Sequence, residues 1–304
     1  MIPFTIRQIE HAIAVLDHGS VARASEALGI AQPTVSASLA KLEDIIGIQL
    51  FIRHHAQGVS PSPQGIAFLS EARNLLSHAQ DLHRQSAEAG TAVEGTICVG
   101  SFTTIAPVFT PQLVAGFQTL HPKASITLQE GTQDKLLDGL RAGRFDCALL
   151  YDVDMPDDLV LTRLGAFQPH VLLPAGHHLA KNTRVSLKDV ANEPFILLDI
   201  APSRTYFTRI LEKEGVIPKI AFSSPSLEVV RGLVGQGLGY SILITRPSGD
   251  TSYSGEHLAV RPIAEPVQPG IIALASLKQL RKTRLVQSFE EFCVEKFKMM
   301  WSPM

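Results

Sequence analysis

The 304-residue chain has little of what marks several protein classes. It holds three cysteines, Cys98, Cys147 and Cys293, whose odd number and wide spacing fit neither a disulfide framework nor a CxxC zinc site. All three lie in apolar stretches, which indicates buried thiols in a reducing compartment. Glycine (22) and proline (19) stay near average usage, which excludes collagen-like and low-complexity chains.

Long apolar runs and an excess of one charge are also missing. The longest segment without a charged residue, 95–122, is interrupted by Pro107 and Pro111, so no membrane span is expected. Arg7 and Glu10 lie where a signal peptide needs an apolar core. The net charge of −2 excludes a generic polyanion binder and leaves any nucleic-acid contact to a local patch. We therefore expect a soluble, cytoplasmic protein without a membrane partner.

Motifs of the common enzyme classes are absent. The chain has no GxxxxGK[ST], HExxH or GxSxG, and GQGLG at 235–239 is followed by Tyr240 where a dinucleotide-binding motif needs glycine. His177 and His178 are adjacent in a polar segment with no third ligand nearby in the sequence, which favours a solvated pair over a metal site. We expect no enzyme, no metal and no cofactor.

Apolar residues within 5–60 recur at three- and four-residue intervals, which predicts three short helices. Gly19 and Gly29 end the first two helices, and Pro33 lies in the first turn of the third. The short connection before Pro33 predicts a helix-turn-helix that leaves the outer face of the third helix free to enter a major groove. A β-hairpin follows over 48–60. The helical pattern alone fits a protein-interaction module equally well.

Residues 20–65 resemble the winged helix-turn-helix of the LysR-type transcriptional regulators. The resemblance rests on matches in register at Ala22, Ala24, Ala27-Leu28, Gln32-Pro33, Val35-Ser36, Leu42-Glu43, Gly47, Leu50-Phe51 and Arg53. Ala31 and Ala37 depart from the family pattern, which usually has Ser or Thr at the first position and often a basic residue at the second. The rest of the chain has the family's length and order, so the resemblance covers essentially all of it.

The resemblance implies a sequence-specific regulator that binds a double-stranded DNA operator through an N-terminal all-α winged helix-turn-helix. Glutamine pairs with adenine, and arginine in the wing neutralises a phosphate. Two histidines in the wing would add positive charge as the pH falls from 8 to 6. The expected DNA-binding residues are Gln32, Pro33, Thr34, Ser36, Arg53, His54 and His55.

A long helix is predicted after Ser62-Pro63, where serine is suited to the N-cap and proline to the first turn. Its apolar residues step by 4, 3, 4 and 3, which is a heptad seam. An amphipathic helix that lies on its own domain is the alternative, but the resemblance implies a linker helix that dimerises. The expected dimerisation residues are Phe68, Ala72, Leu75, Ala79 and Leu82.

From residue 96 strand-like and helical segments alternate, which predicts two α/β lobes. The predicted helices include a short one over 187–191. In the family this two-lobed α/β effector-binding domain resembles periplasmic solute-binding proteins and holds a small-molecule effector between its lobes. No cysteine lies between 148 and 292, so a pair of peroxide-sensing thiols in the second lobe is not expected. The predicted domains are 1–62, 63–90 and 91–304, with lobe I at about 91–163 and 268–304 and lobe II at about 164–267.

Two loops that follow buried strands and precede helices carry hydroxyl groups. Free N–H groups at helix N-termini favour an anion, and an arginine grips a carboxylate bidentately. We therefore predict a small anionic metabolite between the lobes, although these hydroxyls could equally be plain helix caps. The expected effector-binding residues are Ser101, Phe102, Thr103, Thr104, Ser203, Arg204 and Thr205.

We thus expect a homo-oligomer, dimeric through the linker helix and tetrameric beyond it, with RNA polymerase as a further candidate partner. The alternative is a cytoplasmic small-molecule receptor or an α/β enzyme that carries a helical N-terminal module.

Overall fold

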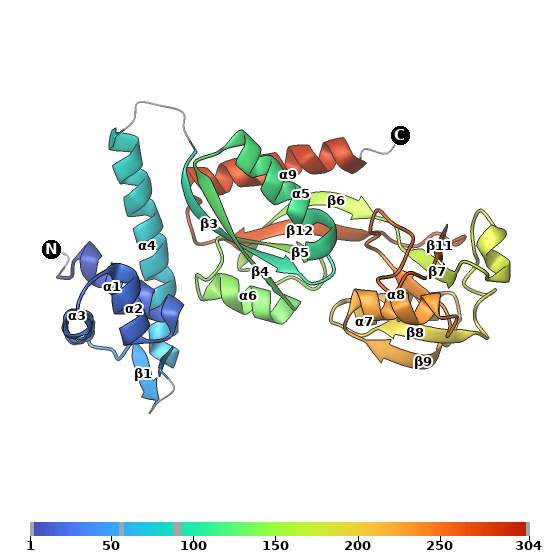
Figure 1. The fold of residues 1–304 in the computed structure, drawn as a ribbon, viewed down its shortest axis with the longest axis horizontal. Helices are drawn as coiled ribbons and strands as arrows, with labels where there is room; N and C mark the ends of the chain where they lie inside the picture. The colour runs from blue at the N-terminus through green and yellow to red at the C-terminus, as the bar shows by residue number, and fades with distance from the viewer. Residues whose placement is uncertain (1–2, 55–57, 88–92, 302–304) are drawn as a thin grey trace.

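The computed structural model describes residues 3–54, 58–87 and 93–301, except for the side chains of 80–87 and 301. An N-terminal domain, a long helix and two α/β lobes follow one another across the molecule (Figure 1). This confirms the predicted fold class. Among the helices of these residues, none combines the length and the apolar character that a bilayer span requires.

The N-terminal domain consists of three helices and a two-stranded antiparallel wing, as predicted. Gly19 and Gly29 end the first two helices in the left-handed conformation, which glycine adopts without a steric penalty. Thr5 and Gln8 form a capping box at the start of the first helix. The elements are α1 (Ile6–His18), α2 (Val21–Leu28), α3 (Gln32–Ile46), β1 (Phe51–His54) and β2 (Gly58–Pro61).

The wing is fixed to α3 and to the turn before α2. The carboxylate of Glu43, near the end of α3, accepts hydrogen bonds from the backbone N–H groups of Leu50 at 2.6 Å and Phe51 at 3.3 Å. From β2, the Val59 N–H donates to the carbonyl of Gly19 at 2.8 Å. Leu50 and Phe51 are both buried, so the domain core sets the position of the wing relative to α3.

The first half of the long helix α4 (Pro63–Ala87) packs on its own N-terminal domain. Leu69 and Ala72 are buried in the core that α1 and α3 also form. Phe68 meets Phe4 edge-on, with ring centroids 6.3 Å apart. This half of α4 therefore completes the hydrophobic core of the domain.

The predicted dimerisation seam is divided between this core and the surface. Phe68 and Ala72 contact their own domain. Leu75 is 39% exposed, and Ala79 is partly buried. The side chain of Leu82 lies outside the described residues. The exposed part of the seam is thus the part that a second copy of α4 could cover.

Lobe I is a five-stranded mixed sheet in the order β4-β3-β5-β12-β6. β3 is parallel to β4 and β5, whereas β12 is antiparallel to β5 and β6. α5 and α9 lie on one side of the sheet and α6 on the other (Figure 1). The elements are β3 (Gly95–Phe102), α5 (Ala106–Leu120), β4 (Ala124–Gly131), α6 (Gln133–Arg141), β5 (Cys147–Tyr151), β6 (Leu159–Phe167), β12 (Gly270–Leu277) and α9 (Arg284–Trp301).

Lobe II contains a three-stranded antiparallel sheet, β10-β7-β11, and a parallel pair, β8-β9. A bridge between Phe195 and Tyr240 joins the two sheets. The last strand and helix of the chain return to lobe I, so two crossing segments connect the lobes. The elements are β7 (His170–Pro174), η1 (His178–Lys181), β8 (Pro194–Leu198), α7 (Ser203–Lys213), β9 (Lys219–Ser224), α8 (Leu227–Gly235), β10 (Ser241–Leu243) and β11 (Leu258–Pro262).

The helix predicted over 187–191 is wrong, because these residues form consecutive turns. Five residues are too few to offset the cost of helix nucleation. The carboxylate of Glu265 instead accepts the Leu187 N–H at 3.2 Å, and the Asp189 N–H donates to Ser186 O at 3.0 Å. The conformation of this segment is therefore determined by a hydrogen bond to a residue that is distant in the sequence.

Candidate functional site

The N-terminus of α3 presents a polar, exposed surface. Gln32, Pro33 and Thr34 are exposed, and Ser36 one turn later is partly buried. Ala31 occupies the N-cap without a side-chain hydrogen bond, as its methyl group requires. Pro33 has no backbone N–H, and the N–H groups of Thr34 and Val35 already donate to Ala31 O at 2.9 and 3.4 Å. The exposed side chains are therefore the groups that this turn offers to a partner. Four of the predicted DNA-binding residues thus share one end of one helix.

The wing lies beside this helix and carries the remaining predicted DNA-binding residues. Arg53 and His54 on β1 are exposed. The imidazole of His54 lies 2.8 Å from the hydroxyl of Ser60 across the hairpin. Within the described residues the Arg53 guanidinium has no hydrogen-bond or ion-pair partner, so it is available to a phosphate. His55 lies outside the described residues.

The first predicted effector loop follows β3, which extends to Phe102 and so includes two of the predicted residues. Ser101 is buried, and its hydroxyl lies 3.1 Å from that of Thr110 on α5. Phe102 packs edge-on against Tyr151, with ring centroids 5.6 Å apart. The hydroxyl oxygen of Thr103 is buried and has no partner in the described part of the chain. Ser101 and Phe102 thus support the loop, and Thr103 offers a free polar group.

Tyr151, at the end of β5, connects the two lobes, and sequence reasoning missed it. The hydroxyl of Thr104 donates to Tyr151 Oη at 3.5 Å, and Thr245 of lobe II also hydrogen-bonds to Tyr151. Burial raises the pKa of Tyr151 to about 12, which keeps the phenol neutral. Residues from three separate segments therefore meet in a buried hydroxyl cluster between the lobes.

The second predicted effector loop opens α7. Ser203 is buried at the helix start, whereas Arg204 and Thr205 are exposed. The Arg204 guanidinium forms a bidentate pair with the carboxylate of Asp199, with both N–O distances at 2.5 Å. This pair lowers the pKa of Asp199. Arg204 already has a carboxylate partner, so a ligand anion would have to compete with Asp199 for it.

An interlobe cavity of about 550 Å³ lies beside α7. Lobe I contributes Asp152 and Asp154, α7 contributes Arg209 and Lys213, and the crossing segment 267–271 also lines the cavity. Of the predicted effector-binding residues, only Thr205 lines this cavity. The second predicted effector loop thus reaches this cavity through Thr205.

The charges around this cavity are unequal. Asp152 is paired with Arg163 at 2.7 Å. Within the described residues Arg209, Lys213 and Asp154 have no hydrogen-bond or ion-pair partner through their charged groups. Two unpaired cations thus face one unpaired carboxylate. This lining favours a ligand that carries net negative charge.

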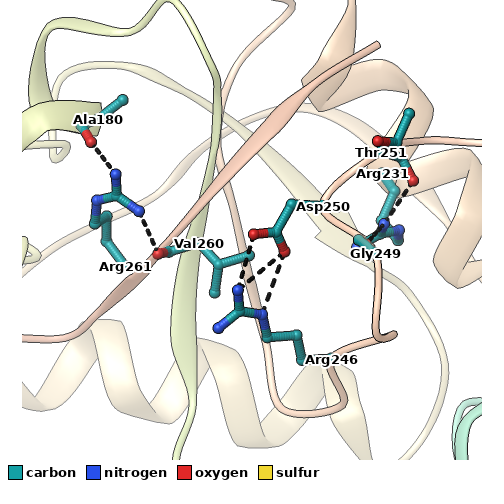
Figure 2. Close-up of polar contacts among 8 residues, drawn as sticks. All are labelled: Ala180, Arg231, Arg246, Gly249, Asp250, Thr251, Val260 and Arg261. Carbon is teal, nitrogen blue, oxygen red and sulfur yellow. Dashed lines mark hydrogen bonds and ion pairs between the residues drawn. The ribbon is translucent and has the colours of Figure 1, made fainter. Parts of the chain in front are cut away.

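Three arginines of lobe II are satisfied within the lobe (Figure 2). Arg231 and Arg246 anchor the segment that connects β10 to β11, and Arg261 joins β11 to η1. Their acceptors are, in that order, the carbonyls of Gly249 and Thr251, the carboxylate of Asp250, and the carbonyls of Val260 and Ala180.

These arginines lie near His170, and a pH dependence of stability follows. Burial, followed by the positive charges of Arg246 and Arg231, lowers the pKa of His170 to about 4. A histidine in the unfolded chain has a pKa of about 6.5. Between about pH 6.5 and pH 4 the unfolded chain therefore binds more protons than the folded chain, and the free energy of unfolding decreases as the pH falls. We expect a loss of about 2 kcal/mol from His170 between pH 7 and pH 5.

Urea unfolding at both pH values measures this difference. His170→Gln should show a smaller pH dependence than the wild type, whereas His257→Gln, which removes an exposed histidine of the same lobe, should match the wild type. Equal dependence in wild type and His170→Gln would contradict the assignment.

The three thiols are free. Burial raises the pKa of Cys147 and of Cys293 well above the usual value, and it also raises that of Cys98. A thiol that stays protonated at neutral pH is a poor nucleophile. Cys147 and Cys293 are buried, as predicted, whereas Cys98 is only partly buried.

Comparison with known proteins relates both parts of the chain to one family. Residues 6–66 match the bacterial regulatory helix-turn-helix protein, lysR family, and residues 90–298 match the LysR substrate binding domain. HinK, a LysR family transcriptional regulator from Pseudomonas aeruginosa, is 41% identical, with 97% of this chain and 99% of HinK covered and a TM-score of 0.66.

Two further solved structures cover the chain or its C-terminal part. Full-length OxyR C199D from Pseudomonas aeruginosa is 25% identical, with 96% of this chain and 98% of that chain covered and a TM-score of 0.78. The effector binding domain of QuiR in complex with shikimate is 25% identical, with 68% of this chain and 99% of that domain covered and a TM-score of 0.61.

Proposed function

Because this chain belongs to the LysR-type transcriptional regulators, which bind DNA and carry an effector-binding domain, we propose that it responds to a small organic anion held between its lobes. The observation that carries the proposal is the interlobe cavity of about 550 Å³ with two unpaired cations from α7. QuiR binds shikimate, a hydroxylated carboxylate, in a domain of the same fold.

The anionic group of the ligand is placed at Arg209 and Lys213, which lie four residues apart on one face of α7. Charge-assisted hydrogen bonds from two cations to one carboxylate are stronger than those from neutral donors. The hydroxyl groups of the ligand meet the loops 101–104 and 203–205, where the Thr103 hydroxyl lacks a partner within the described residues. The protein acts by binding, so the ligand should be recovered unchanged after incubation.

On the DNA, the α3 residues Gln32, Pro33, Thr34 and Ser36 approach base edges and phosphates. Arg53 and the wing histidines, His54 and His55, approach the backbone. Two copies pair through the exposed side of α4, including Leu75, and place two α3 helices on related half-sites. The dimer can associate further into a tetramer and acts in the cytoplasm, where RNA polymerase is a candidate partner.

Titration calorimetry with a panel of small carboxylates, amino acids and cationic amines tests the effector proposal. Saturable binding of a carboxylate, with no binding of its amide, is the expected result. Binding confined to cationic amines would overturn the anionic assignment.

A further inference from the structure

The adjacent histidines at the start of η1 gain a third polar neighbour in the fold. Glu193, just before β8, places its Oε2 2.8 Å from the Nε2 of His177. The rings of His177 and His178 lie 4.5 Å apart, centroid to centroid. One ligand atom from each of the three residues lies within 4.8 Å of the others. The fold thus supplies the third ligand that the local sequence lacks.

The backbone on both sides of this cluster is ordered by hydrogen bonds. The His177 N–H donates to Pro174 O at 3.0 Å, and the Glu193 N–H donates to Val190 O at 3.0 Å. The Nδ1 of His177 accepts the Leu179 N–H at 3.2 Å and so caps η1. His177 and Glu193 are partly buried, whereas His178 is exposed. The cluster is therefore held in place and open to solvent on one side.

We propose that His177, His178 and Glu193 form a binding site for a divalent transition-metal ion of the zinc type. Two imidazoles and one carboxylate are a ligand set that zinc accepts, with a further position left for water. Because His178 is exposed, an ion can reach the site from solvent on this side. This site is separate from the interlobe cavity and does not depend on the proposed effector.

Protons balance in the binding step. Because Nδ1 of neutral His177 accepts a hydrogen bond, its proton is on Nε2 and points to Glu193. When the ion binds at Nε2, that ring proton moves to Nδ1 through solvent, and the hydrogen bond from Leu179 is lost. His178 and Glu193 bind in their neutral and ionised forms, so no net proton is released. The loss of a long hydrogen bond is consistent with an ion that binds reversibly.

A bound ion would join the turn after β7 to the start of β8. β7 and this turn lie at the end of the molecule opposite the N-terminal domain (Figure 1). The ion would therefore tie together two segments of lobe II without touching the crossing segments between the lobes.

Titration of the full chain, stripped of metal and free of any histidine tag, with ZnCl₂ in a calorimeter tests the site. We expect one ion per chain and an affinity that falls about tenfold or more in His178→Ala and in Glu193→Gln. The absorption of bound Co²⁺ should show nitrogen and oxygen ligation in the wild type and change in both variants. His257→Ala and Asp189→Asn, which remove exposed groups of the same lobe, are matched controls and should bind as the wild type does.

Circular dichroism without metal shows whether the variants fold, and exposed His178 can be removed without opening the core. Absence of saturable zinc binding in the wild type would overturn the proposal. Zinc binding that persists in His178→Ala and Glu193→Gln but disappears in His54→Ala would assign the ion to the wing and would also overturn it.

Discussion

Removing the Gln32 side chain is expected to reduce the discrimination between operator and non-operator DNA by about 10- to 100-fold. Gln32 is exposed at the start of α3, where we propose that it meets a base edge. A bidentate pair between a glutamine amide and adenine contributes about 1–3 kcal/mol of discrimination. Fluorescence anisotropy with the operator and a scrambled duplex measures the ratio. Gln112→Ala, which removes an exposed glutamine from α5, is the matched control.

Arg53→Ala separates phosphate contact from base readout on the same surface. It should weaken binding to both duplexes alike and lower the salt slope by about one, because one phosphate contact is lost. Arg144→Ala removes an exposed positive charge from lobe I and should leave the salt slope of DNA binding unchanged. Equal discrimination in Gln32→Ala and wild type, with an unchanged slope in Arg53→Ala, would mean that α3 and the wing do not meet the DNA.

Arg209→Ala is expected to weaken effector binding by about 10- to 100-fold while DNA affinity without effector stays unchanged. A hydrogen bond to a charged group contributes about 1.5–3 kcal/mol, and Arg209 has no other partner within the described residues. Calorimetry with the carboxylate found in the panel measures the loss. Lys188→Ala removes an exposed cation of lobe II outside the cavity and serves as the control.

The same titration distinguishes the cavity from the predicted loops. If Thr103→Val and Arg204→Ala abolish binding while Arg209→Ala has no effect, the ligand lies at the loops and the assignment to the α7 cavity is wrong. Arg204→Ala also leaves the Asp199 carboxylate without its partner, and this negative charge would repel an anion even if Arg204 does not contact the ligand. Asp199→Asn resolves this, since it should strengthen ligand binding only if Arg204 grips the anion.

Local signals were sufficient for the N-terminal domain. Gly19, Gly29 and Pro33 act through the backbone of their own turns, so the helix ends could be predicted from residue type alone. The contact between Glu43 and the wing could not be predicted in this way. It joins residues seven and eight positions apart, and the sequence does not distinguish the Glu43 carboxylate from an ordinary surface group.

The C-terminal domain shows where local reasoning ends. In β6 the neighbouring Thr162 and Arg163 interrupt the apolar residues, and the strand is stabilised by its pairing with the distant β12. The register of the β6–β12 pair shifts between Ile272 and Ala273 of β12, and no local sequence pattern indicates this shift. The 187–191 segment looked helical by composition, but Glu265 holds it as turns.

The candidate sites show the same division. Thr103 and Thr104 could be singled out as hydroxyls after a strand, but Tyr151, which Thr104 contacts, comes from another strand and Thr245 from the other lobe. Likewise Glu193 reaches His177 only after the chain has passed through η1 and several turns. Residues that are distant in the sequence and meet only in the folded chain show no characteristic spacing. Their contacts therefore could not be predicted from the sequence.

The central claim is that α3 reads DNA sequence and that a ligand between the lobes modulates this binding. Selection of duplexes from a random pool by the full-length protein, followed by anisotropy titration of the selected duplex with and without saturating carboxylate, tests it most directly. We predict enrichment of a sequence with two related half-sites and a change in its affinity when the ligand is added. Equal affinity for selected and scrambled duplexes at every salt concentration, whether or not ligand is present, would contradict the account.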